Sequence, residues 1–139
     1  MRKIKFALAV ILVTLGFSSC EEDLDFFSDD LRESFLGEWS VKEENTLKST
    51  DYYIVKIENS ESDSTAVLIS NFYSIGDDFA VEGVVSGSRI TIPTQTVSGF
   101  TFQGYGTITL SGKIINWSYN VDFNNGTTDS ATAIFTKQD

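Results

Sequence analysis

The chain has 139 residues, with 20 acidic residues, ten basic residues, no histidine and a formal net charge of −10. So acidic a chain is unsuited to nucleic acid, because nucleic-acid binding depends on neutralising phosphates with Lys and Arg. Without histidine the chain lacks the usual general base near neutral pH and the commonest metal ligand. We therefore expect no catalytic residue, no metal and no cofactor, and we expect a monomer.

The first 19 residues have the three parts of a secretory signal peptide. Positions 2–5 carry three positive charges, residues 6–17 are uncharged and mostly apolar, and Ser18 and Ser19 are small residues at a cleavage site. The apolar stretch has about 12 residues, and a membrane-spanning helix needs roughly 20. We therefore expect residues 1–19 to be a leader that is removed in front of Cys20.

The segment Phe17-Ser18-Ser19-Cys20 resembles a lipobox, in which the cysteine sulfur receives diacylglycerol. Cys20 is the only cysteine, so it has no disulfide partner within the chain. Removal of the leader leaves seven basic residues against 20 acidic ones, a net charge of −13, which disfavours an anionic membrane surface. The sequence therefore predicts a membrane anchor that consists of lipid on Cys20, because two or more acyl chains attach a protein stably.

An acidic stretch follows the lipidated cysteine. Seven acidic residues and one basic residue, Arg32, lie between positions 21 and 33. Such a run repels itself and stays extended, so residues 20–33 are predicted to be a tether. The stretch also resembles the surface-export signal of lipoproteins from the Bacteroidota. That resemblance implies an outer-membrane lipoprotein on the cell surface, and the periplasmic face is the alternative.

Residues 34–139 have the composition and turn spacing of an all-β domain. Thr, Ser, Val, Ile and aromatic residues recur, and Pro occurs once. Four turn signals lie 12 to 14 residues apart: Ser86-Gly87, Ser98-Gly99, Ser111-Gly112 and Asn125-Gly126. Such pairs favour hairpin turns.

Residues alternate between apolar and polar along the segments between these turns, which indicates strands with one buried face. Predicted strands cover 38–44, 51–58, 64–70, 79–85, 88–93, 100–110, 113–123 and 129–137. Predicted inward residues include Phe79 in the fourth of these strands and Phe100 to Leu110, at every second position, in the sixth. The inward faces of 51–58 and 64–70 stay unassigned, because both faces are apolar. Pro93 is expected at a strand end or a bulge.

Eight strands joined by short turns predict an antiparallel up-and-down barrel, with a two-sheet sandwich as the alternative. Before the first strand, Asp30 and Glu33 fit an acidic N-cap and its N3 partner. A short helical turn over 31–36 would place Leu31 and Phe35 on one face, over one end of the barrel.

The segment Leu36-Gly37-Glu38-Trp39 resembles the Gly-x-Trp signature of the lipocalin and calycin barrels. Residues 86–95 and the ending 131–137 resemble lipocalin-like lipoproteins of the Bacteroidota. The resemblance implies an eight-stranded barrel with one open and one closed end. It also implies that Lys137, from the last strand, packs on Trp39.

Acidic residues are the remaining candidates for catalysis, because a carboxylate pair can hydrolyse glycosides. Asp77, Asp78, Asp122 and Asp129 occur in contexts that resemble loops or face solvent. Residues in such contexts mostly serve solubility, so we do not expect an enzyme.

Four inward aromatic residues are candidate ligand-binding residues: Phe100, Phe102, Trp117 and Tyr119. They would suit a small hydrophobic ligand. An eight-stranded barrel is just wide enough either to hold such a ligand or to be filled by its own side chains. A filled barrel would instead be an interaction module for a protein or glycan, an inhibitor or an accessory subunit. Tyr52, Tyr73 and Tyr105 are expected on its surface.

Overall fold

The computed structural model describes residues 30–46 and 50–139. The predicted leader, Cys20 and the tether up to residue 29 lie outside the described residues. Residues Leu31–Asp139 form one compact unit, and the following description concerns that unit.

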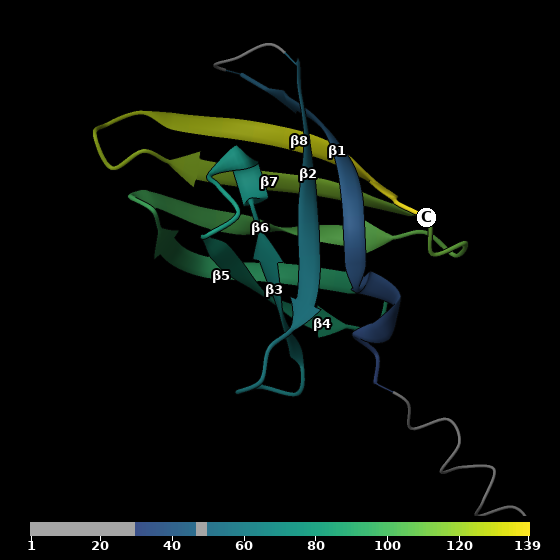
Figure 1. Cartoon of the computed structure of the whole chain (residues 1–139). Helices are drawn as coiled ribbons and strands as arrows, with labels where there is room; N and C mark the ends of the chain where they lie inside the picture. Colours follow the sequence, from purple (N-terminus) through teal and green to yellow (C-terminus); the bar gives the residue numbers. More distant parts are fainter. Residues whose placement is uncertain (1–29, 47–49) are drawn as a thin grey trace, which may run out of the picture. The chain divides into compact units, whose positions relative to one another are not determined.

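Eight antiparallel strands close into a barrel in which each strand pairs with its neighbours in the chain and β8 pairs with β1 (Figure 1). This confirms the predicted up-and-down barrel. The elements are η1 (Glu33–Phe35), β1 (Gly37–Asn45), β2 (Thr50–Asn59), β3 (Ala66–Ser70), η2 (Phe72–Ser74), β4 (Ala80–Ser86), β5 (Arg89–Val97), β6 (Phe100–Ile108), β7 (Ile114–Asp122) and β8 (Thr128–Lys137).

The alternation of the sequence sets which face of each strand is buried. Along β7 every second residue from Ile115 to Val121 is buried and those between are exposed, and β8 repeats the pattern from Asp129 to Phe135. The two strands that the sequence left unassigned follow the same rule from Val55 and from Val67 onward, although Ala66, the first residue of β3, is also buried. Val55 and Ile57 of β2 are buried, as are Val67 and Ile69 of β3.

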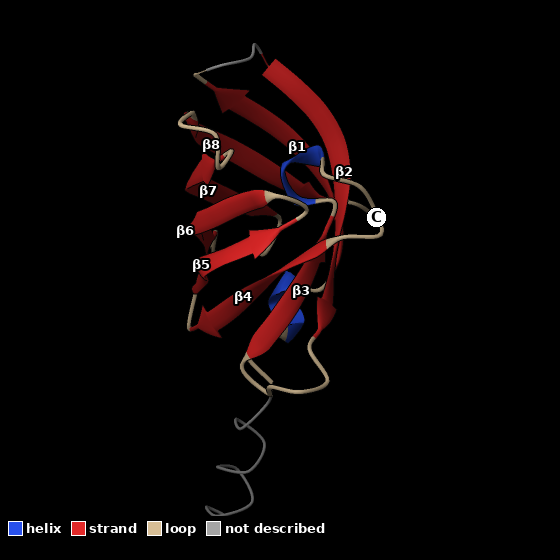
Figure 2. Ribbon diagram, turned by 90° about the vertical axis from the view of Figure 1, so that its left-hand side faces the viewer, coloured by secondary structure: helices blue, strands red, loops and turns tan. Residues whose placement is uncertain are grey.

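Each of the two short helical turns belongs to one end of the barrel (Figure 2). The η1 end comprises the start of β1 and the loops 60–65, 87–88 and 109–113. The η2 end comprises the loops 71–79, 98–99 and 123–127. Neither turn has the length or the apolar character to cross a bilayer.

The η1 end is closed by Phe35, which is fully buried, and the Trp39 Nε1 donates a hydrogen bond of 2.9 Å to its carbonyl oxygen. The Lys137 Nζ lies 5.2 Å from the Trp39 ring centroid, which is the arrangement that the lipocalin resemblance implies. The predicted cap is wrong. The N-cap residue of η1 is Arg32 and not Asp30, and it makes no side-chain cap hydrogen bond. Leu31 is exposed, because η1 is a single 3-10 turn and is too short to give Leu31 a buried face.

Two predicted inward residues are exposed. Phe79 lies before β4, where its N–H bonds to the Gly76 carbonyl, and Leu110 lies beyond β6 in the turn to β7. Neither residue belongs to a strand, so the alternation of inward and outward side chains does not apply to them. Strand β5 runs past Pro93, and its register with β6 shifts between Ile92 and Gln95, as expected of a bulge at proline.

Gly104 and Gly106 of β6 make room for large rings on β7. They pair with Tyr119 and Trp117. A Cβ on Gly106 would lie 2.7 Å from the Trp117 Cδ2, and one on Gly104 would overlap the Cα and Cβ of Tyr119. The two glycines therefore let both rings lie across the interior.

Candidate functional site

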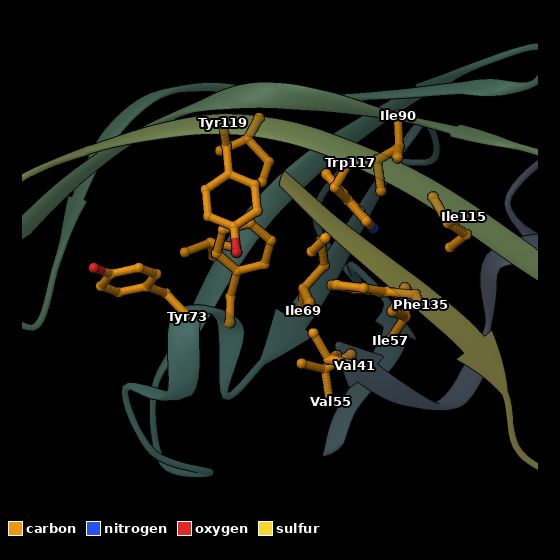
Figure 3. Packing of buried hydrophobic residues seen from close by; sticks show 14 of the residues in the cluster. Val41, Val55, Ile57, Ile69, Tyr73, Ile90, Ile115, Trp117, Tyr119 and Phe135 are labelled. Carbon is orange, nitrogen blue, oxygen red and sulfur yellow. The ribbon is translucent and has the colours of Figure 1, made fainter. Parts of the chain in front are cut away.

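The four aromatic residues that the sequence singled out lie in one cluster inside the barrel. Phe102, Trp117 and Tyr119 are buried, and Phe100 is partly buried and packs against the core. Figure 3 shows Trp117 and Tyr119 extending from β7 across the interior, with aliphatic side chains such as Val55 and Ile69 on the other side. The cluster belongs to the half of the barrel nearer the η2 end.

The centre of this cluster is Phe72, which comes from the loop between β3 and β4 and not from the barrel wall. It is fully buried. Its ring centroid lies 4.7 Å from that of Tyr119, 5.5 Å from Trp117 and 5.7 Å from Phe102. Three of the four predicted residues therefore surround a side chain that a loop inserts.

Tyr73, the next residue, covers the cluster at the η2 end. Its ring lies 6.2 Å from both Phe100 and Phe102 and 6.3 Å from Phe123. The expectation that Tyr73 is a surface residue is wrong. It is 5% exposed, because the loop turns its ring inward.

The backbone that carries these two rings has an unusual conformation. Asn71, Tyr73 and Ser74 have φ values of 63°, 56° and 61°, in the left-handed region that costs an L-residue about 1–2 kcal/mol. Asn71 holds the segment. Its Nδ2 donates to the Ile54 carbonyl at 2.9 Å, and its Oδ1 accepts from the Gly76 N–H at 2.8 Å. We call residues 71–79 the plug.

A buried carboxylate, Glu43, lies beside the cluster on β1. It is 1% exposed. Its Oε1 accepts hydrogen bonds from the hydroxyls of Tyr53, at 2.5 Å, and Tyr119, and its Oε2 accepts one of 3.0 Å from Asn45. A buried carboxyl group is tolerated only when hydrogen bonds replace its hydration, and both Glu43 oxygens have donors.

Asp129 is a second buried carboxylate, and the expectation that it faces solvent is wrong. It is fully buried, because it lies on the inward face of β8. Its Oδ1 accepts from the N–H and hydroxyl of Thr46, and its Oδ2 accepts from the Tyr73 hydroxyl at 2.5 Å. Asp129 therefore fastens the plug to the barrel wall.

The three interior phenols are held in their neutral form. Burial, and then the neighbouring carboxylates, raise the pKa of Tyr53 and Tyr73 well above the ordinary value of 10.0. The pKa of Tyr119 is raised by burial first, then by Tyr53 and Glu43. All three hydroxyls therefore act as donors near neutral pH.

Trp117 has the one buried side-chain polar atom without a partner in the described part of the chain. Its Nε1 makes no hydrogen bond, although the side chain is only 3% exposed. An unpaired buried donor costs about 1–3 kcal/mol. In Figure 3 this nitrogen points into the interior, toward Phe135.

The outer surface offers hollows and aromatic residues of its own. One hollow lies over β1, β8 and β7 beside Lys42 and Ile134, and another lies over β5, β6 and β7 beside Tyr105. Tyr52 is 73% exposed, and Tyr105 is exposed with Arg89 over its ring. Among the described residues, no group of three or more acidic or cysteine side chains could hold a metal.

Comparison with known proteins identifies a fold. No family model and no curated protein matches the chain. The chain is similar to the solved structure of EF1p2_mFAP2b bound to DFHBI, with a TM-score of 0.57 and 12% identity, over 78% of this chain and 98% of that one. It is also similar to a redesigned beta barrel, b11L5F_LGL, with a TM-score of 0.56 and 11% identity, over 81% of this chain and 98% of that one. At these identities the likeness shows the barrel fold alone.

The sequence carried a signal for the two carboxylates but none for the plug. Glu43 follows Trp39 and Val41 on the inward face of its strand, and Asp129 precedes Ala131 and Ala133 on the inward face of its own. The period of two that located the rings could have located both acids, but it was not applied to them. Phe72 and Tyr73 lie outside any periodic segment.

Proposed function

We propose that this chain is a lipid-anchored binding barrel that holds a small, mainly apolar molecule at its η2 end. The observation that carries the proposal is that Phe72 and Tyr73 come from the loop between β3 and β4 and not from a strand. The walls of the cluster come from strands β6 and β7, but its centre comes from a loop. A loop can leave without disturbing the barrel ladder, whereas a wall residue cannot.

The chemistry of this region suits a guest molecule. Binding sites are mostly apolar with a few placed polar groups, and here aromatic walls adjoin Glu43, Asp129 and the unpaired Trp117 Nε1. A barrel of the same fold was solved bound to DFHBI, which supports the capacity of this architecture to hold a small molecule. The proposal includes no catalytic step.

The proposed compartment is the outer membrane, at the cell surface, with attachment through lipid on Cys20. The support is the Phe17-Ser18-Ser19-Cys20 segment after an apolar leader. Replacing Cys20 with Ala should move the protein from the detergent phase to the aqueous phase, or leave it unprocessed. A cleaved Cys20→Ala protein that still partitions with membranes would refute the anchor.

Native mass spectrometry of the full chain, purified from its own cells, tests the binding function. The proposal predicts an additional retained mass of a small molecule, which disappears when the protein is refolded from denaturant. Refolded protein should then take up added neutral aromatic probes. A protein that carries no extra mass and takes up no probe would contradict the binding function.

A second candidate function is an interaction module with a filled interior. The packing of Phe72 and Tyr73 inside the barrel and the exposure of Tyr52 and Tyr105 favour it. If no probe binds, substitution of Tyr52 and Tyr105 by Ser should abolish capture of a surface partner without changing the melting temperature.

A further inference from the structure

We infer that residues 71–79 form a displaceable plug that imitates a ligand, and that the true ligand is a flat aromatic phenol whose hydroxyl replaces that of Tyr73 on Asp129. This inference rests on the proposed binding function and assigns its ligand class and its regulation.

The plug occupies the space that a two-ring guest would fill. Phe72 contributes a ring stacked among Phe102, Trp117 and Tyr119. Tyr73 contributes a second ring nearer the η2 end and a hydroxyl donated to Asp129. Removal of both side chains would leave an aromatic-walled space with a carboxylate near its entrance.

The polar groups of this space select one kind of molecule. Asp129 keeps the two donors of Thr46 when Tyr73 leaves, but its Oδ2 loses its donor. A guest hydroxyl in the place of the Tyr73 hydroxyl would restore the bond to that oxygen. At the deeper end of β7, the free Nε1 of Trp117 needs an acceptor, which the plug does not supply. The preferred guest has a phenol at one end and a carbonyl or similar acceptor at the other.

The plug has a strained backbone, which lowers the free energy needed to displace it. Three of its residues have left-handed φ values, and such strain persists only where the surroundings maintain it. The segment is joined to the barrel wall through Asn71, through ring packing and through Tyr73, whose hydroxyl donates to Asp129 and whose backbone bonds to the Tyr53 side chain. A ligand with affinity for the open state shifts the population toward it.

Calorimetric titration of the full chain with two matched probes tests the inference. The probes are 6-hydroxy-2-naphthaldehyde and 6-methoxy-2-naphthaldehyde, at mildly acidic pH so that the hydroxyl stays protonated. The hydroxy compound should bind about tenfold or more tightly, because only it donates a hydrogen bond to the Asp129 Oδ2, which the methoxy compound leaves without a donor. Trp117→Phe should weaken both probes alike, since both carry the carbonyl that Nε1 would bind.

Asn71→Ala tests the plug without removing a ring. It deletes the bond to Ile54 and the one from Gly76, so the open state gains population and both probes should bind about threefold or more tightly. The matched control is Asn124→Ala. Asn124 also has a positive φ, 60°, and its Nδ2 donates to a backbone carbonyl at 2.9 Å, but it lies outside the plug, so affinity should not change.

The outcomes separate the two proposals. If neither probe binds any variant, the binding function itself is wrong and the plug with it. If both probes bind but Asn71→Ala matches Asn124→Ala, the function stands and the plug is refuted. Equal affinity for the hydroxy and methoxy probes refutes the phenol class. If Asn71→Ala does not fold, Gly76→Ala supplies the same test, because Gly76 has a φ of +117° that alanine adopts only under strain.

Discussion

Glu43 and Asp129 place two carboxylates inside the barrel, each surrounded by side chains that donate hydrogen bonds. Packed apolar residues of similar volume are often as stable as such groups. Their presence beside an aromatic cluster is therefore better explained by selection of a polar atom on a guest than by stability. This is why we assign the polar end of the ligand to Asp129.

Tyr53 and Tyr52 give a residue-scale prediction because they are adjacent in β2 and face opposite ways. Tyr53→Phe removes a donor from Glu43 and should lower the free energy of unfolding by about 1–3 kcal/mol. Tyr52 is 73% exposed, so Tyr52→Phe should change it by less than about 0.5 kcal/mol. Urea unfolding of both variants measures the difference, and equal losses would contradict the Glu43 network.

The two tryptophans give a second prediction at this scale. Trp39 donates to the Phe35 carbonyl, whereas the Trp117 Nε1 has no partner. Trp39→Phe should therefore destabilise the protein by about 1 kcal/mol more than Trp117→Phe, because only the first change leaves a buried acceptor unpaired. Thermal or urea unfolding of the two variants measures this difference in stability. A larger loss for Trp117→Phe would contradict this prediction.

At the scale of elements, the strands were predictable and the plug was not. Alternation located β7 and β8 because each strand has one buried and one exposed face. Ser98 and Gly99, both with positive φ, formed the expected two-residue turn between β5 and β6. The plug has no period, and its conformation depends on Asn71 and on rings that are distant in sequence. Local residue types could not predict that contact, so Tyr73 was expected outside.

Hydrogen exchange gives the element-scale prediction. The amides of Ser74 and Ile75 bond to the carbonyl oxygens of Asn71 and Phe72, which also belong to the plug. They should exchange through a local opening whose free energy is lower than that of the β7 and β8 amides. Exchange measured at several denaturant concentrations distinguishes local from global opening. Plug amides that exchange only with global unfolding would contradict a displaceable segment.

For the whole molecule, the buried phenols of Tyr53, Tyr73 and Tyr119 make the free energy of unfolding depend on pH in the alkaline range. Their pKa values are raised in the folded state above the ordinary 10.0. The unfolded chain therefore loses these protons first, so stability is fully present below about pH 10 and falls as pH rises further. The urea midpoint should decline above about pH 10, and Tyr119→Phe should reduce the slope. A flat profile would contradict neutral buried phenols.

The proposed ligand enters the η2 end of the barrel by displacing the plug. Hydrogen exchange of residues 71–79, measured with and without saturating 6-hydroxy-2-naphthaldehyde, tests it most directly. Bound ligand should speed exchange of the plug amides and slow exchange of the β7 amides beside Trp117 and Tyr119, because the plug leaves while the wall is stabilised. A probe that binds and leaves the plug amides unchanged or more protected would contradict the claim.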